Sequence, residues 1–146
     1  MESKVSEHIY APGEYQCRKR RAMQTKPKHI LKSHPHSFHS IELAKQFENL
    51  VQSDPRFELV APPAFSLRVI RIRSPTASSQ EEVDALNRKL WDILQTRSDE
   101  VLLTQTVLPE VGFCIRVAIG SPLTKQEHVD AAWKVIRECA DVALAS

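Results

Sequence analysis

Residues 41–58, IELAKQFENLVQSDPRFE, place a helix, a stop signal and the start of a strand in one short stretch. Apolar side chains recur three and four positions apart through Ile41–Val51, which predicts an amphipathic helix that starts near Ser40. Pro55 ends this helix, because the residue before a proline avoids the helical region. Phe57–Ala61 then predicts a short strand that ends at two prolines.

Three further strands and two further helices are predicted downstream. The strands are expected at Phe65–Arg73, Val101–Leu108 and Val111–Ile119. Each helix is expected to begin at a capping box, in which a serine or threonine precedes a glutamate by three residues. The pairs are Ser79 with Glu82, or Ser78 with Glu81, and Thr124 with Glu127. Alternation breaks at Val69-Ile70, which indicates either burial on both sides of that strand or a bulge.

The connections between strands decide how the sheet is paired. The links within the first pair of strands and within the second pair are a few residues long, whereas a parallel return would need a long crossover. The sequence therefore predicts a two-layer α+β domain in the order α-β-β-α-β-β-α. Its four-stranded antiparallel sheet is expected to carry helices mainly on one face, and the other face is expected to be partly open.

The first 39 residues differ in composition from the rest of the chain. They hold eight Lys or Arg and three Glu, a net charge of +5, whereas residues 40–146 hold twelve Lys or Arg and fifteen Asp or Glu, a net charge of −3. We therefore predict a basic, His-rich, poorly ordered tail over residues 1–39 and one folded domain over residues 40–146.

Two motifs in this tail have a functional alternative. CRKRR at residues 17–21 is typical of a solvated basic tail, and an anion-binding or nuclear-localisation patch is the alternative. The histidines could bind a metal, but a zinc site needs a rigid scaffold, so we predict no metal site. These histidines are His29, His34, His36 and His39.

Composition excludes several classes of function. The longest apolar runs are far shorter than the ~20 residues of a membrane helix, and no signal peptide is expected at the N-terminus. The mildly acidic domain gives no reason to expect a nucleic-acid partner. Three widely spaced cysteines, Cys17, Cys114 and Cys139, indicate reduced thiols and a cytoplasmic protein.

Arg116 is the candidate functional residue of the domain. It interrupts an otherwise apolar strand, where an unpaired charge is costly to bury. Its guanidinium could pair with a group of this domain, or it could contact a larger neighbouring domain across an interface. His128 is expected to be an exposed or interface residue, and Trp133 is expected in the core. No grouping of nucleophile, acid and base predicts a catalytic site.

Several segments, in their order along the chain, resemble the C-terminal small domain of the pyridoxal-phosphate-dependent aromatic amino acid decarboxylases. The segments are LAKQFENLVQSDPRFELV, SLRVIRIR, VDALNRKLWDIL, FCIRVAIG and LTKQEHVDAAWKVI. The family includes DOPA, tyrosine and histidine decarboxylases. The resemblance implies an antiparallel sheet whose uncovered face packs against a large catalytic domain, and it implies that Arg116 is a supporting residue at that interface.

The resemblance also implies what this segment lacks. In the family, the cofactor lysine and its histidine and aspartate partners belong to the large domain of an obligate homodimer. No lysine of this chain matches the cofactor lysine, so we expect no catalytic or cofactor-binding residue and no activity of the chain alone. The expected partner is the large domain or a full-length decarboxylase subunit. The alternatives are a non-catalytic regulatory module that pairs with such an enzyme, and a small amino-acid-sensing domain.

Overall fold

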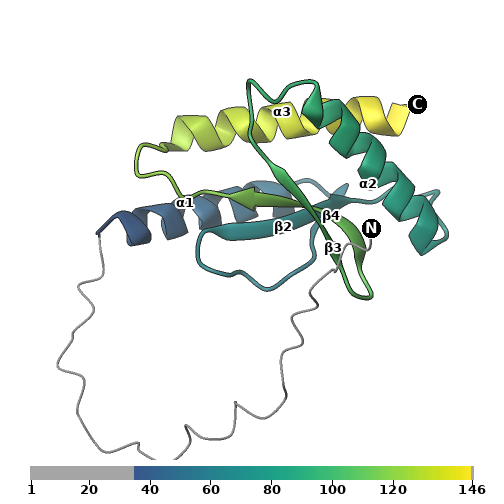
Figure 1. The fold of residues 1–146 in the computed structure, drawn as a ribbon, viewed down its shortest axis with the longest axis horizontal. Coiled ribbons are helices and arrows are strands. Elements are labelled where there is room, and N and C mark those ends of the chain that lie inside the picture. Colours follow the sequence, from purple (N-terminus) through teal and green to yellow (C-terminus); the bar gives the residue numbers. More distant parts are fainter. Residues whose placement is uncertain (1–34, 146) are drawn as a thin grey trace, which may run out of the picture. The chain divides into compact units, whose positions relative to one another are not determined.

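The computed structural model of the chain describes residues 35–145, with side chains from Phe38 onward. Three helices and four strands follow one another in the predicted order α-β-β-α-β-β-α (Figure 1). They are α1 (Pro35–Gln52), β1 (Phe57–Leu59), β2 (Leu67–Ile72), α2 (Gln80–Gln95), β3 (Thr104–Leu108), β4 (Gly112–Ala118) and α3 (Gln126–Ala145). The poorly ordered tail predicted for residues 1–39 falls largely outside the described residues.

The sheet is antiparallel throughout and has the order β1-β2-β4-β3. Strands β2 and β4 form its centre, where Ile70 pairs with Ile115 and Val69 pairs with Arg116. Strands β1 and β3 form the two edges. The predicted α+β class and antiparallel pairing are therefore confirmed.

One hydrophobic core joins all three helices to one face of the sheet. Ile70, Ile72, Ile115 and Val117 reach it from β2 and β4, and Phe57 reaches it from β1. Trp133 of α3 is in its centre, as predicted, with its ring 5.7 Å from the Phe47 ring and 4.8 Å from the Phe57 ring. Burial of these side chains is the main source of stability of the domain.

Strand β2 is buried along almost its whole length, which explains the broken alternation at Val69-Ile70. Its pairing with β4 runs without interruption from Leu67 to Ile70, so the alternative of a bulge is wrong. Ile70 faces the helices, and Val69 on the opposite face is also buried. Two-sided burial, rather than a change of register, explains why the adjacent positions 69 and 70 are both apolar.

Two helix starts differ from the predictions. Helix α1 begins at Pro35 rather than near Ser40, which agrees with the preference of proline for the first helical position. Helix α3 begins at Gln126, so Thr124 does not form the predicted capping box. Instead, the ring Nδ1 of His128 accepts a hydrogen bond from the backbone N–H of Lys125 at 3.1 Å. Helix α2, in contrast, has the complete capping box predicted for Ser79 and Glu82.

Candidate functional site

The face of the sheet that points away from the helices is the first candidate site. Strand alternation places every second residue there, and the register of the strands aligns these residues across the sheet. We call this set the outer face: Glu58, Leu67, Val69, Arg71, Thr104, Thr106, Cys114, Arg116 and Ala118. None of them belongs to the hydrophobic core under the helices.

Arg116 lies on this outer face, in a central strand, and its side chain is exposed. Among residues 38–145 it has neither a salt bridge nor a side-chain hydrogen bond, although its backbone pairs with Val69 and Thr104. The alternative of a buried pair within this domain is therefore wrong. An exposed guanidinium avoids the desolvation that a buried one would suffer. Its role at an interface remains a prediction.

The outer face is only partly apolar. Ala118 and Thr104 are exposed beside Arg116, and Leu67 and Thr106 are half-buried. Cys114 and Val69 are buried, so they add little apolar surface. The outer face is thus a mixed surface with a cation at its centre, and it is not a continuous apolar patch.

Three arginines gather at one end of the domain: Arg56 from the turn before β1, Arg71 of β2 and Arg73 just after β2. Glu58 accepts a hydrogen bond from Arg71 through Oε1 and forms a salt bridge with Arg73 through Oε2, at 2.9 Å. One carboxylate is therefore the ionic partner of two guanidinium groups. Arg56 has two carboxylates of its own, Asp54 and Asp141. The Asp54 and Asp141 partners raise the pKa of Arg56, which keeps this guanidinium charged throughout the range in which the protein is folded.

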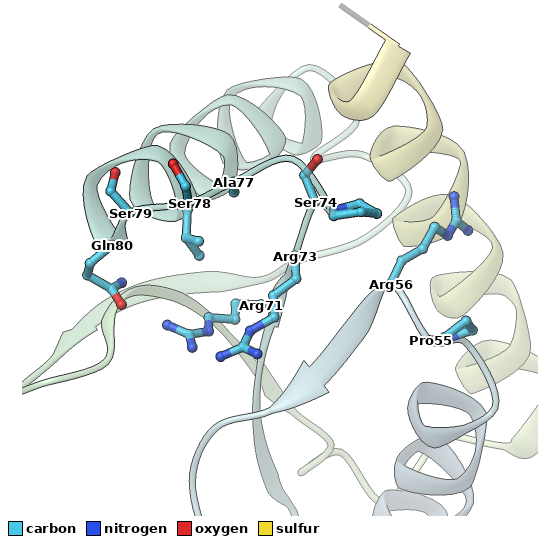
Figure 2. A pocket seen from close by; sticks show the side chains of 11 residues that line it. Pro55, Arg56, Arg71, Arg73, Ser74, Ala77, Ser78, Ser79 and Gln80 are labelled. Carbon is cyan, nitrogen blue, oxygen red and sulfur yellow. The ribbon is translucent and has the colours of Figure 1, made fainter.

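A cavity of about 610 Å³ lies beside this cluster, between the end of β2 and the start of α2 (Figure 2). We call it the arginine cavity. Its lining contains three arginines and no acidic residue: Pro55, Arg56, Arg71, Arg73, Ser74, Pro75, Ala77, Ser78, Ser79, Gln80 and Val83. In Figure 2 the guanidinium groups of Arg71 and Arg73 lie next to each other, and Arg56 points away from them toward α3.

A polar network fixes the wall of the arginine cavity. The carbonyl oxygen of Val111 accepts hydrogen bonds from Arg71 Nη1 at 2.5 Å and from Gln80 Nε2 at 2.6 Å. Gln80 also donates to Asp84, which accepts a further bond from the backbone N–H of Phe113. Strand β2, the β3–β4 turn and the first turn of α2 are thereby held together, so Arg71 cannot swing out without breaking several bonds.

The other predicted site residues have structural positions. Cys114 and Cys139 are free and buried, as predicted, and burial raises the pKa of each thiol, which makes them poor nucleophiles. His128 is exposed, as predicted. His39 donates a hydrogen bond from Nε2 to the backbone carbonyl oxygen of Thr124 at 2.9 Å. Cys17, the CRKRR motif, His29, His34 and the side chain of His36 lie outside the described residues.

The described residues do not fit the pyridoxal phosphate expected in the family. A cofactor of this kind needs a lysine for a Schiff base and an acidic partner for its ring nitrogen. Lys45, Lys125 and Lys134 are exposed on the helices or at their ends. Lys89 donates to the carbonyl of Ala143 at 2.9 Å and lines a small cavity. The one acidic residue of that cavity, Glu82, already accepts hydrogen bonds from the backbone at the start of α2.

No group of three or more His, Cys, Asp or Glu side chains among residues 35–145 is placed to hold a metal ion. None of the described helices has the length and apolar character needed to cross a membrane.

Sequence reasoning did not identify the arginine cavity. The signal was present as arginines at positions 68, 71 and 73 of one predicted strand. Strand alternation separates them, because Arg68 faces the helices and bonds Glu48 of α1 at 2.9 Å, whereas Arg71 faces the outer side. Residue 73 lies just beyond β2, where the chain turns toward α2.

Comparisons with known proteins relate the chain to plant enzymes. The chain is 43% identical over 116 residues to tryptophan decarboxylase TDC2 of Camptotheca acuminata, which covers 80% of this chain and 22% of that enzyme. It is 43% identical over 105 residues to tyrosine decarboxylase 2 of Narcissus pseudonarcissus, covering 72% and 20% of the two proteins. The chain thus spans about a fifth of the length of these relatives. No protein-family model matches it.

Solved structures support the same relationship. The crystal structure of Oryza sativa TDC with PLP and tryptamine matches with a TM-score of 0.67 and 34% identity, over 75% of this chain and 23% of that one. Catharanthus roseus tryptophan decarboxylase in complex with L-tryptophan matches with a TM-score of 0.66 and 36% identity, over 75% and 22%. The described domain is therefore homologous to one domain, about a fifth, of the pyridoxal-phosphate-dependent aromatic amino acid decarboxylases.

Proposed function

We propose that residues 35–145 act as the small, C-terminal domain of an aromatic amino acid decarboxylase and support a catalytic domain without supplying the chemistry. The parent reaction removes the carboxylate of an aromatic amino acid as CO₂, and pyridoxal phosphate supplies an electron sink for it. The observation that carries this proposal is the identity above 40% to decarboxylases, which is confined to about a fifth of their length.

The outer face of the sheet is the surface we propose for docking to the large domain. It is the side of the sheet that the helices leave uncovered, and it holds an exposed cation, Arg116, among small and half-buried side chains. A carboxylate or carbonyl of the large domain would give this guanidinium the partner that it lacks among residues 38–145. Charge pairing of this kind fixes the register of an interface more than it adds affinity.

The first experiment asks whether the chain holds the cofactor by itself. We expect the purified 146-residue chain to give no internal-aldimine absorbance with pyridoxal phosphate and no release of CO₂ from tryptophan or tyrosine. A stoichiometric aldimine band that disappears on substitution of a single lysine would overturn the proposal.

The second experiment tests the docking surface. The chain would be titrated into the large domain of a plant tryptophan decarboxylase, expressed without its own small domain, and the complex followed by sedimentation velocity. We expect a complex that Arg116→Glu weakens and that Lys45→Glu, an equal charge reversal on exposed α1 surface, leaves unchanged. Equal binding of both variants would exclude the outer face as the docking surface.

A regulatory module that pairs with an intact decarboxylase is the second candidate function. The same unpartnered Arg116 favours it, because an uncovered docking face can bind a subunit as well as a covalently linked domain. Full-length decarboxylase mixed with the chain would then lose activity as the chain displaces its own small domain. Unchanged activity, with no complex at micromolar concentrations, would leave only the first candidate.

A further inference from the structure

We propose that the arginine cavity binds a small phosphate monoester, with Arg73 and Arg71 as the residues that hold the phosphate. Nothing in the proposed docking function requires this site, which lies at the end of the domain where β2 leads into α2. Arg71 belongs to both the outer face and this cavity, whereas Arg73 lies beyond β2 and outside the outer face, so variants of Arg73 test the cavity separately from the docking surface.

The charges around the cavity favour an anion. The residues that line the cavity include three arginines and no aspartate or glutamate. Glu58 alone neutralises both Arg71 and Arg73, which leaves one positive charge in excess at this point. A bound anion would restore neutrality in a partly enclosed space, where charge pairs are stronger than in open water.

Hydrogen-bond donors remain available for such an anion. Arg73 uses only Nε for Glu58, and both of its Nη atoms have no partner among residues 38–145. Arg71 uses Nε and Nη1, so its Nη2 is the remaining donor. Arg56 is different, because Asp54 and Asp141 occupy its donors. The two neighbouring guanidinium groups in Figure 2 are therefore the ones that can bind a ligand.

Burial and support make Arg71 a rigid donor. Its side chain is 8% exposed and is held by both Glu58 and the Val111 carbonyl. A guanidinium already fixed in place loses little freedom when a ligand binds. Arg73, at 61% exposed, is the more mobile of the two and can close over a ligand.

The start of α2 contributes its dipole but few donors. Glu82 of the capping box already accepts hydrogen bonds from the backbone N–H groups of Ser78 and Ser79. The positive end of the helix still favours an anion within its first turn. The arginines, rather than the helix N–H groups, are therefore the main ligands in this proposal.

The size and the remaining lining indicate an organic phosphate rather than a bare ion. A volume of about 610 Å³ is in the range of small-molecule sites. Pro55, Pro75, Ala77 and Val83 provide apolar surface for the organic part. Two guanidinium groups match the three terminal oxygens of a phosphate monoester better than the two of a carboxylate.

The test uses the full 146-residue chain and phenyl phosphate as the probe. Isothermal titration and thermal unfolding would be measured with phenyl phosphate, inorganic phosphate, benzoate and sodium chloride at one ionic strength, since salt alone screens charges. We expect phenyl phosphate to bind and to raise the unfolding temperature beyond the chloride control. Inorganic phosphate lacks the organic group and benzoate lacks the phosphate, so both are expected to bind more weakly than phenyl phosphate.

Variants identify the binding residues. Arg73→Gln should weaken phenyl phosphate binding about tenfold or more, because it removes charge-assisted hydrogen bonds. Arg116→Gln removes the same charge from the outer face and should leave the affinity unchanged. Arg73→Lys keeps the charge and a similar length, and it should give an intermediate affinity. If Arg73→Gln is less stable than the wild type, this variant shows whether the loss of binding is due to the lost guanidinium. No stabilisation beyond chloride, or equal binding by Arg73→Gln and the wild type, would overturn the proposal.

Discussion

The side chain of Asn87 in α2 forms a two-point hydrogen bond with the backbone of Ile72 in β2. Its Oδ1 accepts from Ile72 N at 2.8 Å, and its Nδ2 donates to Ile72 O at 2.9 Å and to Val83 O at 2.8 Å. Asn87 is fully buried, so these bonds replace those that water would otherwise make. The hydrogen bonds between Asn87 and Ile72 fix the position and the rotation of α2 relative to the sheet.

Replacing Asn87 should therefore be costly. Asn87→Ala leaves the backbone N–H and C=O of Ile72 without their side-chain partner in the core, and we expect the free energy of unfolding to fall by about 3 kcal/mol. The free energy of unfolding is measured by urea denaturation, with circular dichroism as the signal. Asn49→Ala on exposed α1 surface is the matched control, and its stability should change by less than about 0.5 kcal/mol. A similar loss in both variants would contradict the role given to Asn87.

The ion pair between Arg68 and Glu48 gives the second prediction. Arg68 is almost completely buried on the helix side of the sheet and also donates to the carbonyls of Phe65 and Leu67. Glu48→Gln would leave this guanidinium without its counter-charge, and we expect a loss of about 2 kcal/mol, because an unpaired buried charge is costly. Glu127→Gln, in an exposed pair with Lys125, should change the free energy of unfolding by less than about 0.5 kcal/mol.

Gly112 gives the third prediction. Its φ is +90°, and a Cβ atom at this position would lie 2.1 Å from Oδ1 of Asp84. Gly112→Ala should therefore strain the backbone and displace the Asp84 carboxylate from Phe113 N, with a loss of about 2 kcal/mol or more in the free energy of unfolding. Gly120→Ala is the control, because a Cβ atom added at Gly120 would have no neighbouring atom within 4 Å. Its free energy of unfolding should be nearly that of the wild type. Equal melting temperatures for both variants would show that the turn can rearrange.

The fourth prediction concerns acid stability. Hydrogen bonds from Arg56 lower the pKa of Asp54 below its ordinary value of 3.8, with Arg137 adding a weaker attraction, and partial burial opposes the shift. The folded state therefore binds the Asp54 proton less readily than the unfolded state does. The stabilisation is complete above the unfolded pKa near 3.8 and is lost as the pH falls through the lower folded pKa.

Asp54→Asn should accordingly reduce the loss of stability on acidification. The measurement is the free energy of unfolding in urea at a series of pH values from neutral to strongly acidic. The exposed Asp99, which has no side-chain partner among residues 38–145, provides the control substitution Asp99→Asn. If both variants keep the pH dependence of the wild type, the Arg56–Asp54 interaction does not contribute to acid stability.

Local sequence patterns predicted those parts of the fold that depend on neighbouring residues. The spacing of Ser79 and Glu82 fixes the start of α2, and alternation around Ile115 fixes the two faces of β4. The start of α3 was misassigned because the Thr124 and Glu127 pair has the correct spacing without the correct backbone. There, the ring of His128 satisfies the Lys125 N–H, a role that no capping-box pattern includes.

Parts that depend on tertiary contacts could not be predicted. The sequence left open whether Arg116 pairs within the domain or contacts a neighbouring one, and it is exposed because no helix covers that face. Asn87 looked like an ordinary polar helix residue, and only the position of α2 over β2 places its amide against Ile72. The arginine cavity depends on β2 meeting the start of α2, which no spacing in the sequence specifies.

The strand order β1-β2-β4-β3 has a consequence for how quickly the domain can form. Each outer strand pairs with a neighbour that is close in the chain, so β1–β2 and β3–β4 can assemble early as separate hairpins. The central pairing of Leu67 with Ala118 brings together residues that are separated in the chain by α2 and β3. Closing this long loop costs chain entropy before the strands make their contacts. The pairing of β2 with β4 is therefore expected to control the folding rate.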